Sequence, residues 1–80
     1  MALAFVLLNV EPGTEEEVRD TVSKIEEVKE AHLVYGTYDM VLKLRADTMD
    51  EVKKAVTGKI RKLDEVRSTL TMLVAGPLTE

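Results

Sequence analysis

Several residue types are missing or scarce, and each absence excludes a class of protein. The 80 residues contain no cysteine, no tryptophan, one phenylalanine and one histidine, His32. Without cysteine there is no disulfide and no thiolate metal site, and one imidazole gives metal binding little support. The core must be built from Val, Leu, Ile, Ala and Met. Because so small a core is only marginally stable, we expect self-association to supplement it.

Positive charge is also in short supply. The chain has 11 basic and 15 acidic residues and a net charge of −4, which works against direct binding of DNA or RNA. The apolar run at residues 1–8 is too short to span a bilayer and lacks the flanks of a signal peptide. We therefore expect a cytoplasmic protein that contacts neither nucleic acid nor membrane. The 32% of charged residues, with Asn9 as the only amide side chain, are typical of a thermophile protein.

Hydrophobic periodicity divides the chain, treated as one domain over residues 1–80, into strands and helices. Ala2–Val10 is almost entirely apolar and predicts a central strand buried on both faces. A Thr-Glu-Glu-Glu capping box predicts that a helix begins at Thr14, with Ile25 and Val28 still at helical spacing. The first part of the chain is thus a strand followed by an amphipathic helix.

The middle of the chain predicts a β-hairpin, because the apolar period changes there to two. Its strands are residues 31–35 and 38–46, joined by a tight turn that starts at Gly36. A second capping box at Thr48 predicts another amphipathic helix. Residues 66–75 alternate and predict the closing strand.

The resulting order is that of a ferredoxin-like βαββαβ domain, an α+β fold with a four-stranded antiparallel sheet and two helices on one face. The positions expected to face the helices are Met40, Leu42 and Leu44 in the third strand and Ser68, Leu70, Met72 and Val74 in the fourth. Thr69 and Thr71 are then expected on the open face. Because the open face has apolar residues in its middle, we expect the domain to dimerise through the sheet.

The densest group of polar residues occupies positions 35–39, in the predicted hairpin turn. One interpretation is an ordinary turn, in which glycine supplies a positive φ and the tyrosines pack along the edge. The other is a ligand site, in which turn amides hold a carboxylate and Asp39 accepts from an ammonium group. Such a site would recognise an α-amino acid. Thr69 and Thr71 could add hydroxyl contacts, although β-propensity alone also explains them.

His32 is either a general base, with Glu30 or Tyr35 nearby, or a surface histidine on a strand. The chain has no cysteine nucleophile and no glycine-rich phosphate loop, and its acids gather at helix starts where capping explains them. The sequence therefore predicts no catalytic residue, no metal site and no cofactor.

Two motifs carry a resemblance to a known family. The hairpin sequence Tyr-Gly-Thr-Tyr-Asp-Met-Val-Leu-Lys, from Tyr35, resembles the glycine-x-tyrosine-aspartate hairpin of the Lrp/AsnC feast/famine transcription regulators. The closing Val-Arg-Ser-Thr-Leu-Thr, from Val66, resembles the valine-x-x-threonine-x-threonine strand of the same family. The similarity covers essentially the whole chain and is to the C-terminal effector domain, called the regulation of amino acid metabolism (RAM) domain, without the helix-turn-helix.

The resemblance implies an amino-acid effector domain that forms homodimers through its sheets and assembles them into octamers or decamers, with effectors between dimers. The residues that it places against the effector are Val34, Tyr35, Gly36, Thr37, Tyr38, Asp39, Met40, Thr69 and Thr71. Asp39 would take the amino group, and the apolar Val34 and Met40 favour an aliphatic amino acid. A domain of this kind would regulate transcription indirectly, by co-assembling with full-length Lrp/AsnC regulators.

Two other functions fit the same topology. A small dimeric α/β-barrel enzyme would keep a polar cavity between sheet and helices, with His32 and Tyr38 as acid and base. The residues expected to point inward are aliphatic, which disfavours this alternative. The second is a purely structural oligomerisation domain, or another ligand module such as an ACT domain. We expect a binding module and not an enzyme.

Overall fold

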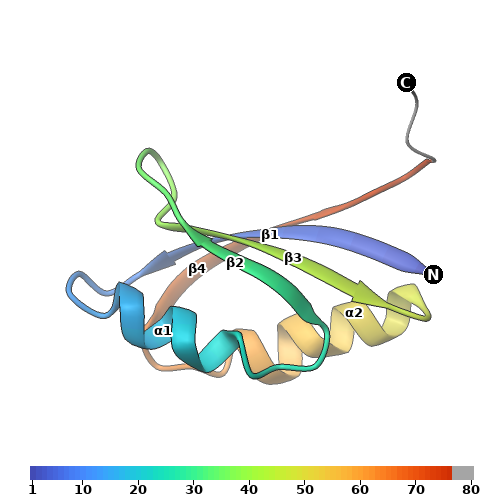
Figure 1. The fold of residues 1–80 in the computed structure, drawn as a ribbon, viewed down its shortest axis with the longest axis horizontal. Coiled ribbons are helices and arrows are strands. Elements are labelled where there is room, and N and C mark those ends of the chain that lie inside the picture. The colour runs from blue at the N-terminus through green and yellow to red at the C-terminus, as the bar shows by residue number, and fades with distance from the viewer. Residues whose placement is uncertain (77–80) are drawn as a thin grey trace.

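The computed structural model describes residues 1–76. Its elements are β1 (Ala2–Val10), α1 (Glu15–Val22), β2 (Val28–Leu33), β3 (Met40–Ala46), α2 (Met49–Ala55), the π-helical turn η1 (Val56–Ile60) and β4 (Val66–Leu73). Both helices lie beneath one face of a four-stranded sheet (Figure 1). This is the predicted ferredoxin-like α+β fold.

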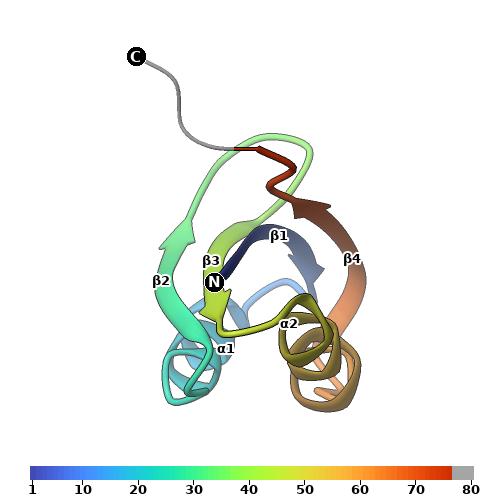
Figure 2. The same cartoon turned by 90° about the vertical axis from the view of Figure 1, so that its right-hand side faces the viewer.

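The sheet has the order β2-β3-β1-β4, with every neighbouring pair antiparallel, so β1 and β3 are central. Seen end-on, the sheet arches over the helices and leaves its other face open (Figure 2). Along β1, buried residues alternate with half-buried ones. The prediction that β1 is buried on both faces is therefore wrong, because in the described chain no layer covers the open face.

The core lies between the sheet and the helices. Met40, Leu42 and Leu44 of β3 are fully buried there, as predicted. Helix residues such as Val22 and Ile60 pack against the same cluster. Every buried residue among those described is hydrophobic, so the helix side of the sheet is filled by aliphatic packing.

The fourth strand presents the opposite faces from those predicted. Thr71 of β4 pairs with Val6 of β1, and Leu70 pairs with Leu7. Directly paired residues share a face of the sheet, so Thr71 lies on the helix side with Val6, as does Thr69. Leu70 and Met72 lie on the open face and are 44% and 46% exposed. The prediction was wrong because apolar alternation cannot identify the inner face of a strand whose open face is apolar too.

The first helix is shorter than predicted. It ends at Val22, and the amides of Lys24 and Ile25 then donate to carbonyls only three residues back. Val28, assigned from its spacing to the helix, is the first residue of β2. An apolar residue at this position suits either element, since it is buried in both.

The predicted two-residue hairpin turn is also wrong. β2 ends at Leu33 and β3 begins at Met40, so residues 34–39 form a longer loop. The Val34 amide donates to the Asp39 carbonyl at 3.0 Å and closes the loop. Gly36 has a φ of 140° within it, a conformation that side chains rarely adopt.

Of the two predicted capping boxes, only the threonine cap of the second forms. At α2 the Thr48 hydroxyl oxygen accepts from the Glu51 amide at 3.2 Å, and it lies 3.1 Å from the Glu51 carboxylate. At α1 the Thr14 hydroxyl instead donates to the Glu11 carbonyl at 2.6 Å and caps nothing. The capping prediction is right for the second helix and wrong for the first.

Candidate functional site

Asp39 is held in place by the end of the central strand β1. Its amide donates to the Leu8 carbonyl at 2.8 Å, and one of its carboxylate oxygens accepts from the Val10 amide at 2.9 Å. These two hydrogen bonds join the loop at 34–39 to the end of β1. Within the described residues, the other carboxylate oxygen of Asp39 makes no hydrogen bond. The side chain is only partly exposed, so its orientation is fixed while one oxygen stays available to a ligand.

Two depressions meet at Asp39 and Glu15, which line both of them. The first, of about 350 Å³, is lined by Glu15, Glu16, Leu33, Val34, Tyr35 and Asp39. The second, of about 330 Å³, is lined by Asn9, Val10, Pro12, Glu15, Asp39, Arg67 and Ser68. The first combines apolar side chains with carboxylates, whereas the second carries a guanidinium, an amide and a hydroxyl beside the carboxylates.

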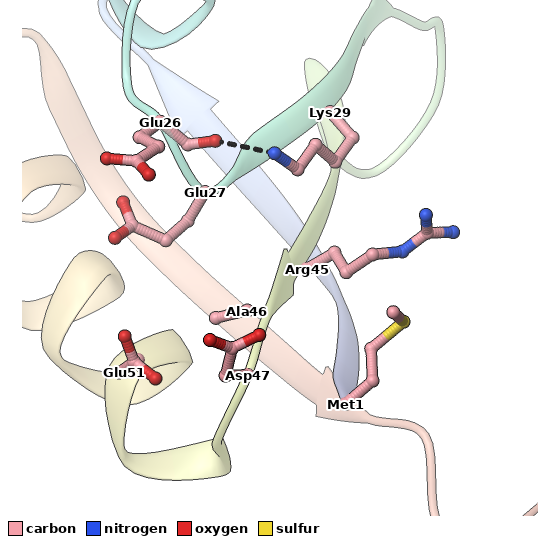
Figure 3. Close-up of a pocket in the computed structure, with 8 residues that line it drawn as sticks. All are labelled: Met1, Glu26, Glu27, Lys29, Arg45, Ala46, Asp47 and Glu51. Carbon is pink, nitrogen blue, oxygen red and sulfur yellow. Dashed lines mark hydrogen bonds between the residues drawn. The ribbon is translucent and has the colours of Figure 1, made fainter.

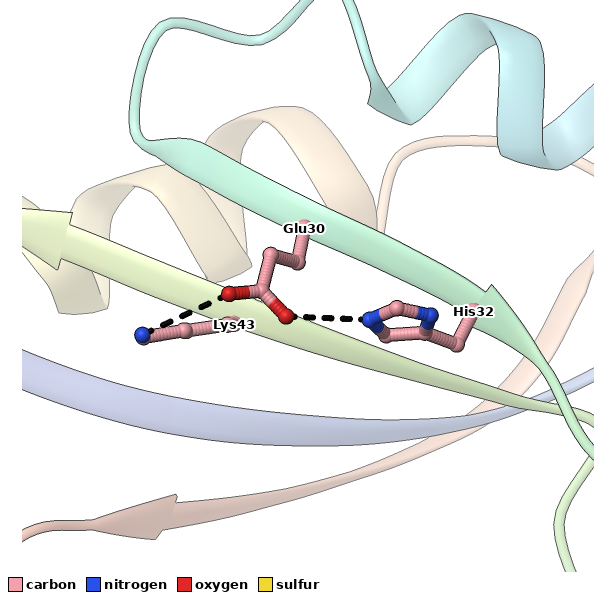
Figure 4. Close-up of polar contacts among 3 residues, drawn as sticks. All are labelled: Glu30, His32 and Lys43. Atoms are coloured by element: carbon pink, nitrogen blue, oxygen red, sulfur yellow. Dashed lines mark hydrogen bonds and ion pairs between the residues drawn. The ribbon is translucent and has the colours of Figure 1, made fainter.

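His32 lies away from this region, on the open face of β2 opposite Val41. Its Nε2 is 3.0 Å from Glu30 Oε1, and Lys43 Nζ is 3.4 Å from Glu30 Oε2 (Figure 4). The hydrogen bond from His32 and the contact with Lys43 hold the pKa of Glu30 below its usual 4.5. The His32 side chain is 60% exposed. This is the surface position that the non-catalytic interpretation of His32 requires.

A further depression, which the sequence did not predict, lies at the opposite end of β1. It is lined by Met1, Glu26, Glu27, Lys29, Arg45, Ala46, Asp47 and Glu51 (Figure 3). Lys29 donates to the Glu26 carbonyl, and Glu27 accepts from Lys59 at 3.0 Å. In residues 1–76 no group of three His, Asp or Glu is placed to hold a metal ion. None of the helices described is long and apolar enough to cross a membrane.

Comparison with known proteins decides the family. The family model described as the Lrp/AsnC ligand binding domain matches residues 3–79. The chain belongs to this family. An uncharacterised HTH-type transcriptional regulator of Pyrococcus furiosus is 41% identical over 73 residues, which cover 88% of this chain and 49% of the regulator. The Lrp/AsnC domain thus spans about half the length of the curated relatives it matches.

Solved structures show the same fold. A hypothetical protein from Pyrococcus horikoshii is 39% identical, with a TM-score of 0.90 over 96% of this chain and 93% of that chain. A transcriptional regulator of Neisseria meningitidis, solved as a complex with L-Met, has a TM-score of 0.86 over 99% of this chain and 53% of that chain. At 17% identity the second likeness shows the fold alone. Relatives from Pyrococcus agree with the thermophile composition.

The Lrp/AsnC domain brings together only some of the residues predicted to contact an effector. Val34, Tyr35 and Asp39 line the first depression, and Gly36 and Thr37 form the exposed tip of the loop. Tyr38 is half-buried. Met40 is fully buried in the core, where its side chain is not accessible to a ligand of this chain.

The closing-strand threonines lie elsewhere in the domain. Thr69 lines a separate depression with Arg61, Val66, Arg67 and Ser68, and Thr71 is half-buried on the helix side of the sheet. Among the described residues, neither lines the two depressions that meet at Asp39.

Sequence reasoning missed several residues that line the two depressions. Glu15 and Glu16 were attributed to the start of α1, where acids are expected in any case. Arg67 and Ser68 stand inside the closing-strand motif, so the motif itself was a signal that could have identified them. Asn9 is the only amide side chain of the sequence, and no other feature of the sequence indicated that it lines a depression.

Proposed function

We propose that this Lrp/AsnC domain binds a free amino acid at Asp39 and regulates transcription indirectly, without catalysing a reaction. The observation that carries the proposal is the anchored carboxylate. The Val10 amide donates to the Asp39 carboxylate at 2.9 Å and so orients it. The partly buried Asp39 side chain lines both depressions. A carboxylate fixed in this way accepts a charge-assisted hydrogen bond from an ammonium group without first having to be ordered.

The first depression suits the side chain of an aliphatic amino acid. Leu33 and Val34 supply apolar surface beside Asp39, and Tyr35 is fully exposed at its edge. The complex of the Neisseria meningitidis regulator with L-Met supports an amino acid as the class of ligand. Met40, however, contributes only packing beneath the site, so selectivity falls to the residues that line the depression.

The open face of the sheet supports a proposal about assembly. Leu70 and Met72 are nearly half exposed on it, and the half-buried Phe5 and Leu7 of β1 lie beside them. We propose homodimers packed sheet to sheet, which assemble further into octamers or decamers. The exposed loop tip would then meet a neighbouring dimer, whose Thr69 and Thr71 could complete the site.

Indirect regulation is proposed because the net charge of −4 works against direct binding of DNA by this domain. The domain matches about half of HTH-type regulators. Co-assembly with full-length Lrp/AsnC regulators in the cytoplasm would let it pass effector occupancy to DNA-bound subunits. The α/β-barrel enzyme is disfavoured, because the space between sheet and helices in the described chain is filled by hydrophobic residues.

The test is thermal unfolding of the purified protein against each of the twenty amino acids at millimolar concentration. A ligand present at 100 times its Kd stabilises the folded state by about 2.7 kcal/mol. We expect a rise in Tm with one or a few amino acids, foremost the aliphatic ones. A flat panel would contradict amino-acid binding and favour the structural oligomerisation domain.

A further inference from the structure

The geometry points to Arg67 as the residue that recognises the carboxylate of the amino acid whose binding at Asp39 is proposed above. Among the described residues, Arg67 is the only cationic side chain that lines the second depression, where it lies with Asn9, Ser68, Glu15 and Asp39. The depression thus has a carboxylate pole and a guanidinium pole. A zwitterion carries the two complementary charges on neighbouring atoms.

The fold brings the two poles together from distant parts of the sequence. The end of β1, the start of α1 and the start of β4 lie at the same end of the molecule (Figure 1). The Glu11 amide donates to the Glu65 carbonyl at 2.8 Å, next to the irregularity in the pairing of β1 with β4. Arg67 lies within this irregularity, between Val66 and Ser68, which pair with Val10 and Asn9, at the strand end where Asp39 is anchored.

Arg67 is available to a ligand in the structure. Its ion pair with Glu11 joins Nε to Oε1 at 3.8 Å, which is longer than a hydrogen bond, and its side chain is 59% exposed. The two terminal nitrogens of a guanidinium form the fork that binds a carboxylate in bidentate geometry. A simple surface ion pair with Glu11 would leave this fork unused.

Ser68 is prepared to assist Arg67. Its hydroxyl oxygen accepts from the Asn9 side-chain amide at 3.1 Å. Because the oxygen is used as an acceptor, the hydroxyl proton is free to donate to an incoming carboxylate. The guanidinium pole, which would bind the ligand's carboxylate, therefore consists of the Arg67 fork and the Ser68 hydroxyl as a pre-oriented neutral donor.

The experiment compares the amino acid that binds most tightly in the panel of twenty with its own carboxamide, by isothermal titration. The carboxamide keeps the ammonium group and the side chain but lacks the negative charge. We measure the ratio of the two Kd values for the wild type, for Arg67→Met and Arg67→Gln, and for Arg61→Met. Arg61 lines the neighbouring depression but not this one, so its substitution removes an equal charge close by.

We expect the wild type and Arg61→Met to prefer the amino acid over its carboxamide by roughly tenfold or more, the range of a hydrogen bond to a charged group. Both Arg67 variants should lose most of that preference while their affinity for the carboxamide changes little. If the Arg67 variants keep the full preference, the role of Arg67 is refuted and amino-acid binding stands. If no amino acid binds to the wild type, the inference and the proposed function are both refuted.

Discussion

The charged residues of this domain fall into two groups according to what fixes them. Glu27 and Glu30 are paired with cations of the same chain, and both have a pKa below the usual 4.5. Asp39 is instead oriented by a backbone amide at 2.9 Å and faces two depressions. The first arrangement stabilises the fold, whereas the second leaves a charge for a ligand.

The Glu27–Lys59 pair makes a prediction about pH. Lys59 donates to Glu27 at 3.0 Å, and this hydrogen bond is the main reason that the pKa of Glu27 lies below 4.5. A depressed pKa in the folded state means that the stabilisation is complete above 4.5 and is lost as the pH falls through the lowered value. Lys59→Met should therefore cost up to about 1 kcal/mol near neutral pH and progressively less in acid.

Thermal unfolding between pH 7 and pH 3 measures this difference. Lys24→Met, which changes an exposed lysine, serves as the control and should follow the wild type. A Lys59→Met deficit that is the same at pH 3 and pH 7 would contradict the assignment.

At the scale of the elements, the sequence predicted the order of strands and helices but not all their limits. The position of β1 along the chain and the core face of β3 follow from their apolar patterns, although the pattern of β1 did not show that one of its faces is only half-buried. The ends of α1 and β2 do not, because Val28 is equally suited to a helix or a strand.

The sequence did not predict which residues of β4 face the helices, for a different reason. Thr69 and Thr71 alternate with Leu70 and Met72, and the apolar members look like core residues. The ladder places Leu70 beside Leu7 on the open face instead. Pairing register decides the face of a strand, and one sequence does not reveal that register when both faces are partly apolar. For the same reason the sequence placed Thr69 and Thr71 on one face with Asp39.

The two helix starts give a matched prediction. The Thr48 hydroxyl accepts from the Glu51 amide, whereas the Thr14 hydroxyl only donates to a carbonyl. Thr48→Ala should destabilise the domain by about 0.5–2 kcal/mol, the usual cost of losing an N-cap. Thr14→Ala should cost clearly less. Urea unfolding of both variants makes the comparison, and equal losses would contradict the difference in capping.

At the scale of the whole molecule, the face of the sheet toward the helices is covered by a complete hydrophobic core, whereas the open face of the sheet is uncovered. The described residues bury no polar side chain beneath the sheet, while Leu70 and Met72 remain exposed above it. A small domain that leaves apolar residues on one face gains stability by covering that face with a copy of itself.

A charge on the open face should prevent this association. We expect Leu70→Lys and Met72→Lys to convert the wild-type assembly into monomers, as seen by analytical ultracentrifugation. Because both side chains are exposed within one chain, circular dichroism should show the fold intact. Thr57→Lys adds the same charge at an exposed position of η1 and should leave the assembly unchanged. Assembly that survives both open-face substitutions would mean that the chains associate through another surface.

The measurement that tests the central claim most directly is isothermal titration of three proteins with the amino acid that raises the Tm of the wild type most. Asp39→Asn keeps an oxygen for the Val10 amide but loses the charge, and Asp20→Asn makes the same change at an exposed site on α1. We predict that Asp39→Asn binds at least about tenfold more weakly, as expected for a lost hydrogen bond between charged groups, and that Asp20→Asn binds like the wild type. Equal affinities for all three proteins would show that the effector does not bind at Asp39.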